Sequence, residues 1–157
     1  MSDTALHGIP NYRVVHAQLA TGGQPSEAQL AEAARMGFEV VINLALHDQP
    51  RYSLPDEPGL VQTLGMAYIW IPVPFDAPTE SHLLDFFAAM RRHQDKKILL
   101  HCAANMRVSA FYGLYLAIEQ HQPLDQAFEL MQDIWEPDDI WNAFIESMLE
   151  KLAPTGE

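Results

Sequence analysis

Three short apolar runs, separated by segments with helical periodicity, constrain the fold of this chain more than any other feature. They occupy residues 38–44 (FEVVINL), 66–73 (MAYIWIPV) and 96–100 (KKILL). Because β-branched residues recur in the first two without a helical period, each of these predicts a strand buried inside a sheet, and residues 96–100 predict a third apolar strand. Strands that alternate with helices, followed by several consecutive helices, indicate an α/β sandwich with a helical C-terminal half.

Caps, glycines and prolines mark the expected boundaries of the other elements. Two short strands or a hairpin are predicted at 12–15 and 18–21. Ser26 lies three residues before Gln29, the spacing of a capping box, so a helix begins there and ends at Gly37. Further helices are expected at 59–65, from Thr79 to about His93, and from Met106 to Leu152 with breaks at 122–123 and 136–137; a surface loop is expected at 45–58.

The composition is that of one globular domain over residues 1–157, with 1–10 and 153–157 expected to be peripheral. The single cysteine excludes an intrachain disulfide, and the N-terminal region has no apolar run typical of a secretory segment, so we expect a cytoplasmic protein. No apolar window approaches the roughly 20 residues that cross a bilayer. A net charge of −12 disfavours nucleic acid and anionic membranes as partners. Any anion site must therefore be local.

The segment KKILLHCAANMRVSAF joins an apolar strand to a helical pattern through a short loop that holds the single cysteine, Cys102. A loop that leads into a helix N-terminus directs free backbone N–H groups at one point and so binds anions. The helix dipole and the nearby Arg107 favour the thiolate of Cys102, which is a nucleophile. Arg107 is suited to bind two phosphoryl oxygens, and Ser109 to donate a hydrogen bond to the departing thiolate.

This arrangement, with His101 and Cys102 ending a strand and Arg107 and Ser109 opening the next helix, resembles the cysteine-dependent protein tyrosine and dual-specificity phosphatases. The segments ATGGQPS, VVINL and IPVPFD are similar to those of small bacterial phosphatases of the DUF442 type. The resemblance extends from Tyr12 to about Glu136. It implies a dual-specificity-phosphatase-like fold with a central, mostly parallel sheet flanked by helices.

The resemblance also assigns roles to residues of the loop. It implies that Cys102 is the nucleophile, that Arg107 is the phosphate clamp, and that His101 supports the loop by hydrogen bonding and tunes the thiolate. The phosphate-binding segment is then expected to comprise Ala103, Ala104, Asn105, Met106, Arg107 and Val108.

The loop departs from the family pattern at one point. The pattern places five residues between Cys and Arg, followed by Ser or Thr, whereas four residues separate Cys102 from Arg107. Ser109 keeps the family spacing, so one alternative is a full-length loop in which Val108 stands where the Arg belongs. The other alternative is a loop shorter by one residue. The usual central glycine is replaced by Asn105, a residue that tolerates a left-handed backbone.

Phosphatases of this type need an acid that protonates the leaving group. Asp76 is the candidate, because it follows the IPVPF segment on a turn between Pro74 and Pro78 and precedes the Thr79 helix. Asp48, in the proline-bearing loop, is the second choice. An Asp beside Pro is also a common turn residue, so a purely structural role for Asp76 is the alternative.

The sequence predicts a phosphatase that hydrolyses phosphate monoesters through a cysteinyl-phosphate on Cys102, with no cofactor and no metal ion. The histidines lack ligand spacing and no second cysteine is present. The expected partner is a phosphorylated protein or small molecule, and the oligomeric state stays open. Two alternatives are a pseudophosphatase that binds phosphorylated ligands without turnover and a rhodanese-like sulfurtransferase, whose cysteine loops are shorter. Oxidation of the thiolate is a further possibility, without a resolving cysteine in the chain.

Overall fold

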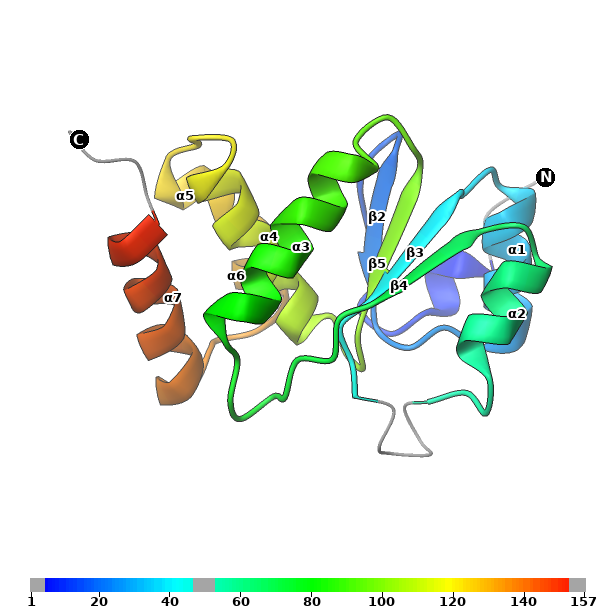
Figure 1. The fold of residues 1–157 in the computed structure, drawn as a ribbon, viewed down its shortest axis with the longest axis horizontal. Coiled ribbons are helices and arrows are strands. Elements are labelled where there is room, and N and C mark those ends of the chain that lie inside the picture. Colours follow the sequence, from blue (N-terminus) through cyan, green and yellow to red (C-terminus); the bar gives the residue numbers. More distant parts are fainter. Residues whose placement is uncertain (1–4, 47–52, 153–157) are drawn as a thin grey trace.

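The computed structural model describes residues 5–46 and 53–152, which build a five-stranded sheet with helices on both faces (Figure 1). The strand order is β1-β2-β5-β3-β4. Only β1 and β2 pair antiparallel, and the other neighbours are parallel. The expected α/β fold with a mostly parallel sheet is therefore confirmed. The strands are β1 (Arg13–His16), β2 (Leu19–Gly22), β3 (Val40–Asn43), β4 (Ala67–Trp70) and β5 (Ile98–His101).

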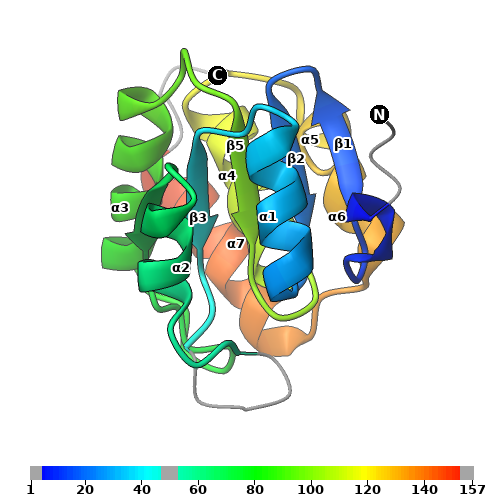
Figure 2. The same cartoon turned by 90° about the vertical axis from the view of Figure 1, so that its right-hand side faces the viewer.

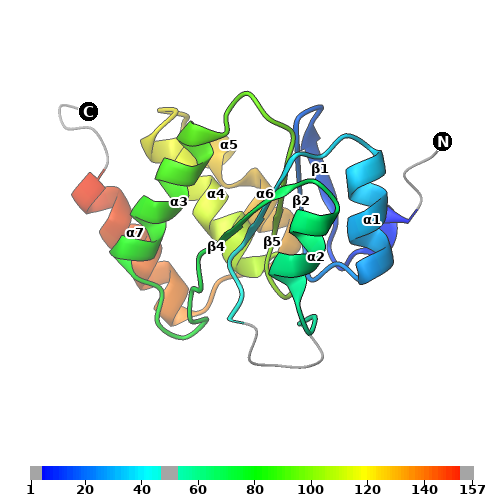
Figure 3. The same cartoon turned by 45° about the vertical axis from the view of Figure 1, so that its right-hand side comes forward.

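The helices divide unequally between the two faces of the sheet. The short helix η1 (Leu6–Gly8), α1 (Glu27–Arg35) and α2 (Glu57–Thr63) lie on one face, which Figure 2 shows from the front. Figure 3 shows the sheet obliquely, between these helices and the larger C-terminal layer. That layer comprises α3 (Glu80–Arg92), α4 (Met106–Ile118), α5 (Leu124–Ala127), α6 (Glu129–Ile134) and α7 (Asp139–Leu152).

Each face of the sheet has its own hydrophobic core. In β3, Val40 and Ile42 pack into the larger core, whereas Val41 packs into the smaller one beneath α1 and α2. In β5, Leu100 packs into the larger core and Leu99 into the smaller one. Successive side chains of a strand point to opposite faces, so a continuous apolar run is the expected sequence of a strand covered on both sides. The prediction of a buried strand at 38–44 is confirmed by β3, and the third apolar strand expected at 96–100 is β5, which is also buried.

The prediction of a buried strand at 66–73 is wrong, because β4 is the edge strand of the sheet. It pairs with β3 alone among the strands, and it is shorter than the apolar run. Ala67 is exposed, and Trp70 is 46% exposed. Apolar content does not reveal whether a strand has one neighbour or two, since that depends on the order of strands in the sheet.

Other boundaries differ in detail. The capping box of Ser26 is present in α1, but Pro58, expected in a loop, lies in the first turn of α2, where its missing N–H costs nothing. The segment 5–10 is not peripheral, because Leu6 and Ile9 are buried in the smaller core. A further break, at Phe128, separates α5 from α6.

Helix α4 is surrounded by other elements and presents its N-terminus to the end of β5. It contacts α3, α5, α6 and α7 and also β2. Gly113 permits this packing, since a Cβ there would lie 2.3 Å from Cδ1 of Phe128. No helix in the described ranges is long and apolar enough to span a membrane.

Candidate functional site

The segment between β5 and α4 places Cys102 at the carboxyl edge of the parallel strands. His101 is the last residue of β5, Cys102 follows it, and α4 begins at Met106. Asn105 is the N-cap residue and has a left-handed backbone with φ of 67°, as its place in the motif suggests. The side chain of Cys102 is fully buried. Parallel strands and helix N-termini meet at this edge of α/β sheets, where ligands usually bind.

The first half of the loop is held by the chain that leaves β2. The N–H of Gln24 donates a hydrogen bond of 3.0 Å to the carbonyl of Ala103, and Gly23 forms an isolated antiparallel bridge with Ala104. A Cβ on Gly23 would lie 2.4 Å from the carbonyl oxygen of Ala103. Only glycine allows this close approach, so the Gly-Gly-Gln-Pro segment shapes the cysteine loop.

Asn105 fixes the second half of the loop. Its side-chain Nδ2 donates to the carbonyl of Asn11 and to Oγ1 of Thr21, both at 2.9 Å. Asn11 in turn donates from Nδ2 to the carbonyl of Ala104 at 2.9 Å. The sequence suggested Asn105 for its backbone conformation, but the contribution of Asn11 and Thr21 is a tertiary contact without a sequence signal.

Arg107 turns its guanidinium toward the segment between β4 and α3. Its Nη1 donates to the carbonyl of Val73 at 2.8 Å, and its Cζ lies 5.7 Å from the centre of the Phe75 ring. Its Nε is buried and has no hydrogen-bond partner in the described residues. Val108 is fully buried in the larger core. Of these two residues, Val108 packs into the core and Arg107 forms polar contacts with the segment between β4 and α3.

Asp76 lies on the same segment, directly after Phe75. Its side chain is exposed and forms no hydrogen bond or ion pair within residues 5–46 and 53–152. Trp141 of α7 anchors the segment by donating from Nε1 to the carbonyl of Phe75 at 2.7 Å. This bond ties the turn that carries Asp76 to α7. Asp48, the second candidate acid, lies outside the described residues.

The hydroxyl of Ser109 forms hydrogen bonds with groups other than Cys102. It donates to the carbonyl of Met106 at 2.9 Å and accepts a hydrogen bond of 3.1 Å from Nε1 of Trp135. In the described part of the chain no hydrogen bond joins Ser109 to Cys102, so the expected donation to the thiolate requires rotation of the hydroxyl and stays a prediction.

His101 forms a buried pair with Glu57, the first residue of α2. Nε2 of His101 lies 2.5 Å from Oε2 of Glu57, and both side chains are fully buried. The other ring nitrogen, Nδ1, lies 3.2 Å from the carbonyl oxygen of Cys102. Gln24 donates from Nε2 to Oε1 of Glu57 at 2.8 Å. Sequence reasoning missed Glu57, because it occurs among loop-like residues and its partner is 44 positions away.

Tyr68 of β4 lies near the same carboxylate. Asn43 donates from Nδ2 to the Tyr68 hydroxyl at 3.0 Å, and its Oδ1 accepts from the N–H of Ala45 at 2.9 Å. Burial raises the pKa of the Tyr68 hydroxyl well above its usual range, the charge of Glu57 adds to this, and the hydrogen bond from Asn43 opposes it. The Tyr68 hydroxyl therefore keeps its proton at ordinary pH, including when Glu57 is ionised.

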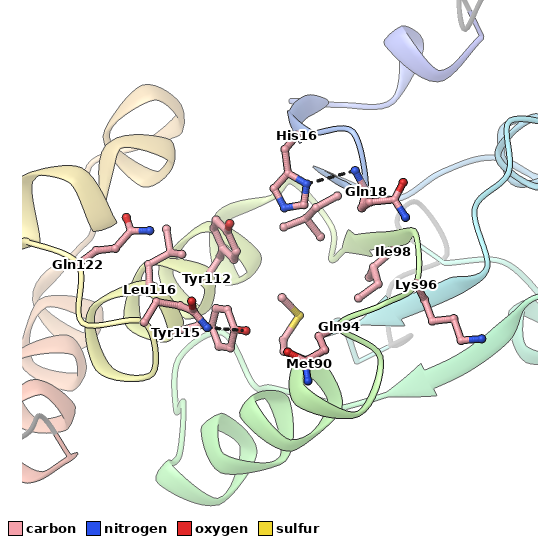
Figure 4. Close-up of a pocket in the computed structure, with 12 residues that line it drawn as sticks. His16, Gln18, Met90, Gln94, Lys96, Ile98, Tyr112, Tyr115, Leu116 and Gln122 are labelled. Atoms are coloured by element: carbon pink, nitrogen blue, oxygen red, sulfur yellow. Dashed lines mark hydrogen bonds between the residues drawn. The ribbon is translucent and has the colours of Figure 1, made fainter.

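A cavity of about 320 Å³ lies at the opposite ends of β2 and β5. His16, Met90, Tyr112 and Tyr115 border it (Figure 4). Nδ1 of His16 accepts from the N–H of Gln18 at 3.1 Å. Burial, with a smaller contribution from Tyr115, raises the pKa of Tyr112 to about 12. This cavity is separate from the cysteine loop, because Cys102 follows the other end of β5.

Comparisons with known sequences identify a phosphatase family. The profile of the family described as DSP-PTPase phosphatase fused to NAD+ kinase matches residues 6–135. Beta-lactamase hydrolase-like proteins from two strains of Xylella fastidiosa, Temecula1 and 9a5c, are each 27% identical over 118 residues, or 71% of this chain. The chain spans only 26% of the length of these curated relatives.

Solved structures give the same result for the fold. The DUF442 protein of Shewanella putrefaciens CN-32 has a TM-score of 0.85 and 33% identity, covering 98% of this chain and 100% of its own. TpbA of P. aeruginosa, solved with phosphotyrosine, has a TM-score of 0.68 and 16% identity, covering 92% and 85%. Kinase associated phosphatase, solved with its catalytic-site cysteine replaced by serine, has a TM-score of 0.74 and 14% identity, covering 85% and 86%. The last two show a shared fold.

Proposed function

Because this chain belongs to the family described as DSP-PTPase phosphatase fused to NAD+ kinase, we propose that it hydrolyses phosphate monoesters through a cysteinyl-phosphate on Cys102. The observation that carries the proposal is the position of this cysteine between the end of β5 and the N-terminus of α4. Free N–H groups and the helix dipole at that point favour both a thiolate and a bound phosphate.

The reaction proceeds in two displacements. Sγ of Cys102 attacks phosphorus, an S–P bond forms, the P–O ester bond breaks, and Asp76 gives its proton to the leaving oxygen. Water then attacks the cysteinyl-phosphate and transfers a proton to the Asp76 carboxylate. The S–P bond breaks, inorganic phosphate leaves, and the thiolate is restored. The exposed position of Asp76, on the segment that Arg107 contacts through the carbonyl of Val73, supports this assignment.

The phosphoryl oxygens are bound by the backbone of residues 103–108 and by Arg107. Since buried donors without partners are rare in folded proteins, the unpaired Nε of Arg107 is consistent with a position that a ligand oxygen completes. Ser109 assists the second displacement when its hydroxyl rotates from the Met106 carbonyl toward the departing thiolate. The substrate class is a phosphorylated protein or small molecule, and the phosphotyrosine complex of TpbA makes aryl phosphates the first choice for assays.

A second candidate is a protein that binds phosphate groups without turnover. The four-residue spacing between Cys102 and Arg107, together with the hydrogen bond that holds Arg107 on Val73, favours this alternative. Binding needs only the loop and its charge, whereas turnover also needs a thiolate aligned with an acid. A sulfurtransferase is not proposed, because the matched family consists of phosphatases.

The two candidates are separated by hydrolysis of a small aryl phosphate, measured across pH with a chelator present. We expect activity in the wild type, none in Cys102→Ser, and reduced activity in Asp76→Asn. If the wild type and Cys102→Ser are equally inactive while both bind vanadate or phosphate, the binding protein replaces the phosphatase. Asp85→Asn, an exposed acid on α3, is the matched control for Asp76.

A further inference from the structure

Glu57 is a buried acid that touches the residue before the nucleophile. We infer that Glu57 is a positioning residue that keeps a second proton on His101, so that a buried imidazolium stabilises the thiolate of Cys102. This inference rests on the proposed function only for the role of the thiolate as a nucleophile. The protonation of His101 itself is independent of turnover.

The hydrogen-bond partners of His101 require two protons. A carbonyl oxygen only accepts, so Nδ1 must donate to the carbonyl of Cys102 across their 3.2 Å contact. That proton is the single one that a neutral imidazole carries. The 2.5 Å contact between Nε2 and Oε2 of Glu57 needs another proton between the two atoms. Together Glu57 and His101 therefore carry two protons, one on Nδ1 and one between Nε2 and Oε2. A neutral imidazole beside an ionised carboxylate would carry only one.

The surroundings favour the arrangement of carboxylate and imidazolium. The second oxygen of Glu57 accepts from Nε2 of Gln24 at 2.8 Å, and a donated hydrogen bond stabilises the ionised acid. Among the described residues, the titratable neighbours include Tyr68 of β4, whose pKa is raised by burial and further by the charge of Glu57, and Cys102 itself. Full burial of both partners strengthens their attraction, since little water screens it.

The pair is oriented with its positive end toward the nucleophile. The imidazole is bonded through Nδ1 to the backbone of Cys102, whereas the carboxylate of Glu57 lies on the far side of the ring. A thiolate on Cys102 that lies closer to the ring than to the carboxylate is attracted by the imidazolium more than it is repelled by the carboxylate. Glu57 acts through His101.

The substitution Glu57→Gln removes the charge of the side chain and nearly keeps its shape. The new amide keeps an oxygen that accepts from Gln24 and gains an NH₂ group that donates to Nε2 of His101. The Nδ1 bond to Cys102 is retained, but the second proton is lost. Glu32→Gln is the matched control, because Glu32 is buried, pairs with Arg35 within α1, and has no described contact with Cys102.

Two readouts test the inference without substrate. Ring-nitrogen NMR, with the His101 signals assigned from a His101→Asn variant, should show two N–H groups at neutral pH in the wild type and one in Glu57→Gln. The ultraviolet titration of the thiolate, corrected with Cys102→Ser, should move to higher pH by about one unit in Glu57→Gln, a roughly tenfold loss of thiolate below the midpoint. Glu32→Gln should change neither readout.

A single N–H on His101 in the wild type would overturn the inference, and so would an unchanged thiolate titration in a folded Glu57→Gln protein. If thermal unfolding shows that this variant does not fold, the ring spectrum of the wild type decides alone. Absence of hydrolysis by a wild type with two N–H groups on His101 would instead contradict the phosphatase proposal and leave the assignment of Glu57 standing.

Discussion

Arg107 donates a hydrogen bond of 2.8 Å to the carbonyl of Val73, three residues before the candidate acid Asp76. This bond joins the first turn of α4 to the segment between β4 and α3. The two parts of the proposed reaction, phosphate binding and leaving-group protonation, are therefore coupled through one side chain. Movement of Arg107 toward a bound phosphate alters the contact that holds the acid-bearing segment.

Arg107→Lys tests this coupling. Lysine lacks the planar guanidinium, whose several donors can bind the Val73 carbonyl and, in the proposed site, a phosphate, and it loses the contact with the Phe75 ring. We expect vanadate binding to weaken about 10-fold or more, and the free energy of unfolding to fall by about 1–3 kcal/mol for the lost buried bond. Chemical denaturation and vanadate titration measure the two effects.

Arg91→Lys is the control for that experiment. Arg91 is 57% exposed and pairs with Glu119 on the surface, so its replacement should change the stability by less than about 1 kcal/mol. Equal effects of the two substitutions on vanadate binding would contradict a role for Arg107 at the phosphate.

Asp76→Asn should affect substrates according to their leaving groups. An alkoxide is a strong base and needs the proton, whereas an activated phenoxide departs with less help. We expect a loss of about 10²–10⁴-fold for an alkyl phosphate and a smaller loss for an activated aryl phosphate, measured as kcat/KM. Equal losses for both substrates would show that Asp76 is not the proton donor.

Much of the fold was accessible from the sequence because its signals are local. Ser26 and Gln29 form the capping box that their spacing predicts, and Thr79 caps α3. The run FEVVINL has three consecutive branched apolar residues at 40–42, as expected of a strand covered on both faces, and β3 is such a strand. The position of the loop between strand and helix also follows from this alternation.

The missed features depend on contacts between distant parts of the chain. Glu57 and His101 are 44 positions apart, and the sequence does not distinguish a buried glutamate from an exposed one. Asn11 reaches Ala104 only because the hairpin of β1 and β2 lies beside β5. The direction of the Arg107 side chain was equally hidden, since it depends on where the segment after β4 crosses α4.

Gly23→Ala should disturb the cysteine loop. The added Cβ would lie 2.4 Å from the backbone oxygen of Ala103, and neither backbone segment can move without breaking the bond from Gln24. We expect a loss of about 1–3 kcal/mol in the free energy of unfolding, together with weaker vanadate binding. Gly8→Ala is a milder comparison, because its Cβ would meet only the end of the Gln29 side chain, at 3.0 Å. Unchanged vanadate binding in Gly23→Ala would contradict the bracing role.

Tyr112→Phe should change the response of stability to alkaline pH. The folded protein holds the pKa of Tyr112 at about 12 against an ordinary value of 10, so above pH 10 the unfolded chain loses this proton first. The contribution is complete below pH 10, and stability falls as pH rises from 10 toward 12. Near pH 11 the wild type should have lost about 1 kcal/mol that Tyr112→Phe retains. Both proteins should be similar at pH 8, because the hydroxyl forms no hydrogen bond with the described residues. Parallel curves of unfolding free energy against pH would show that burial of Tyr112 does not control its ionisation.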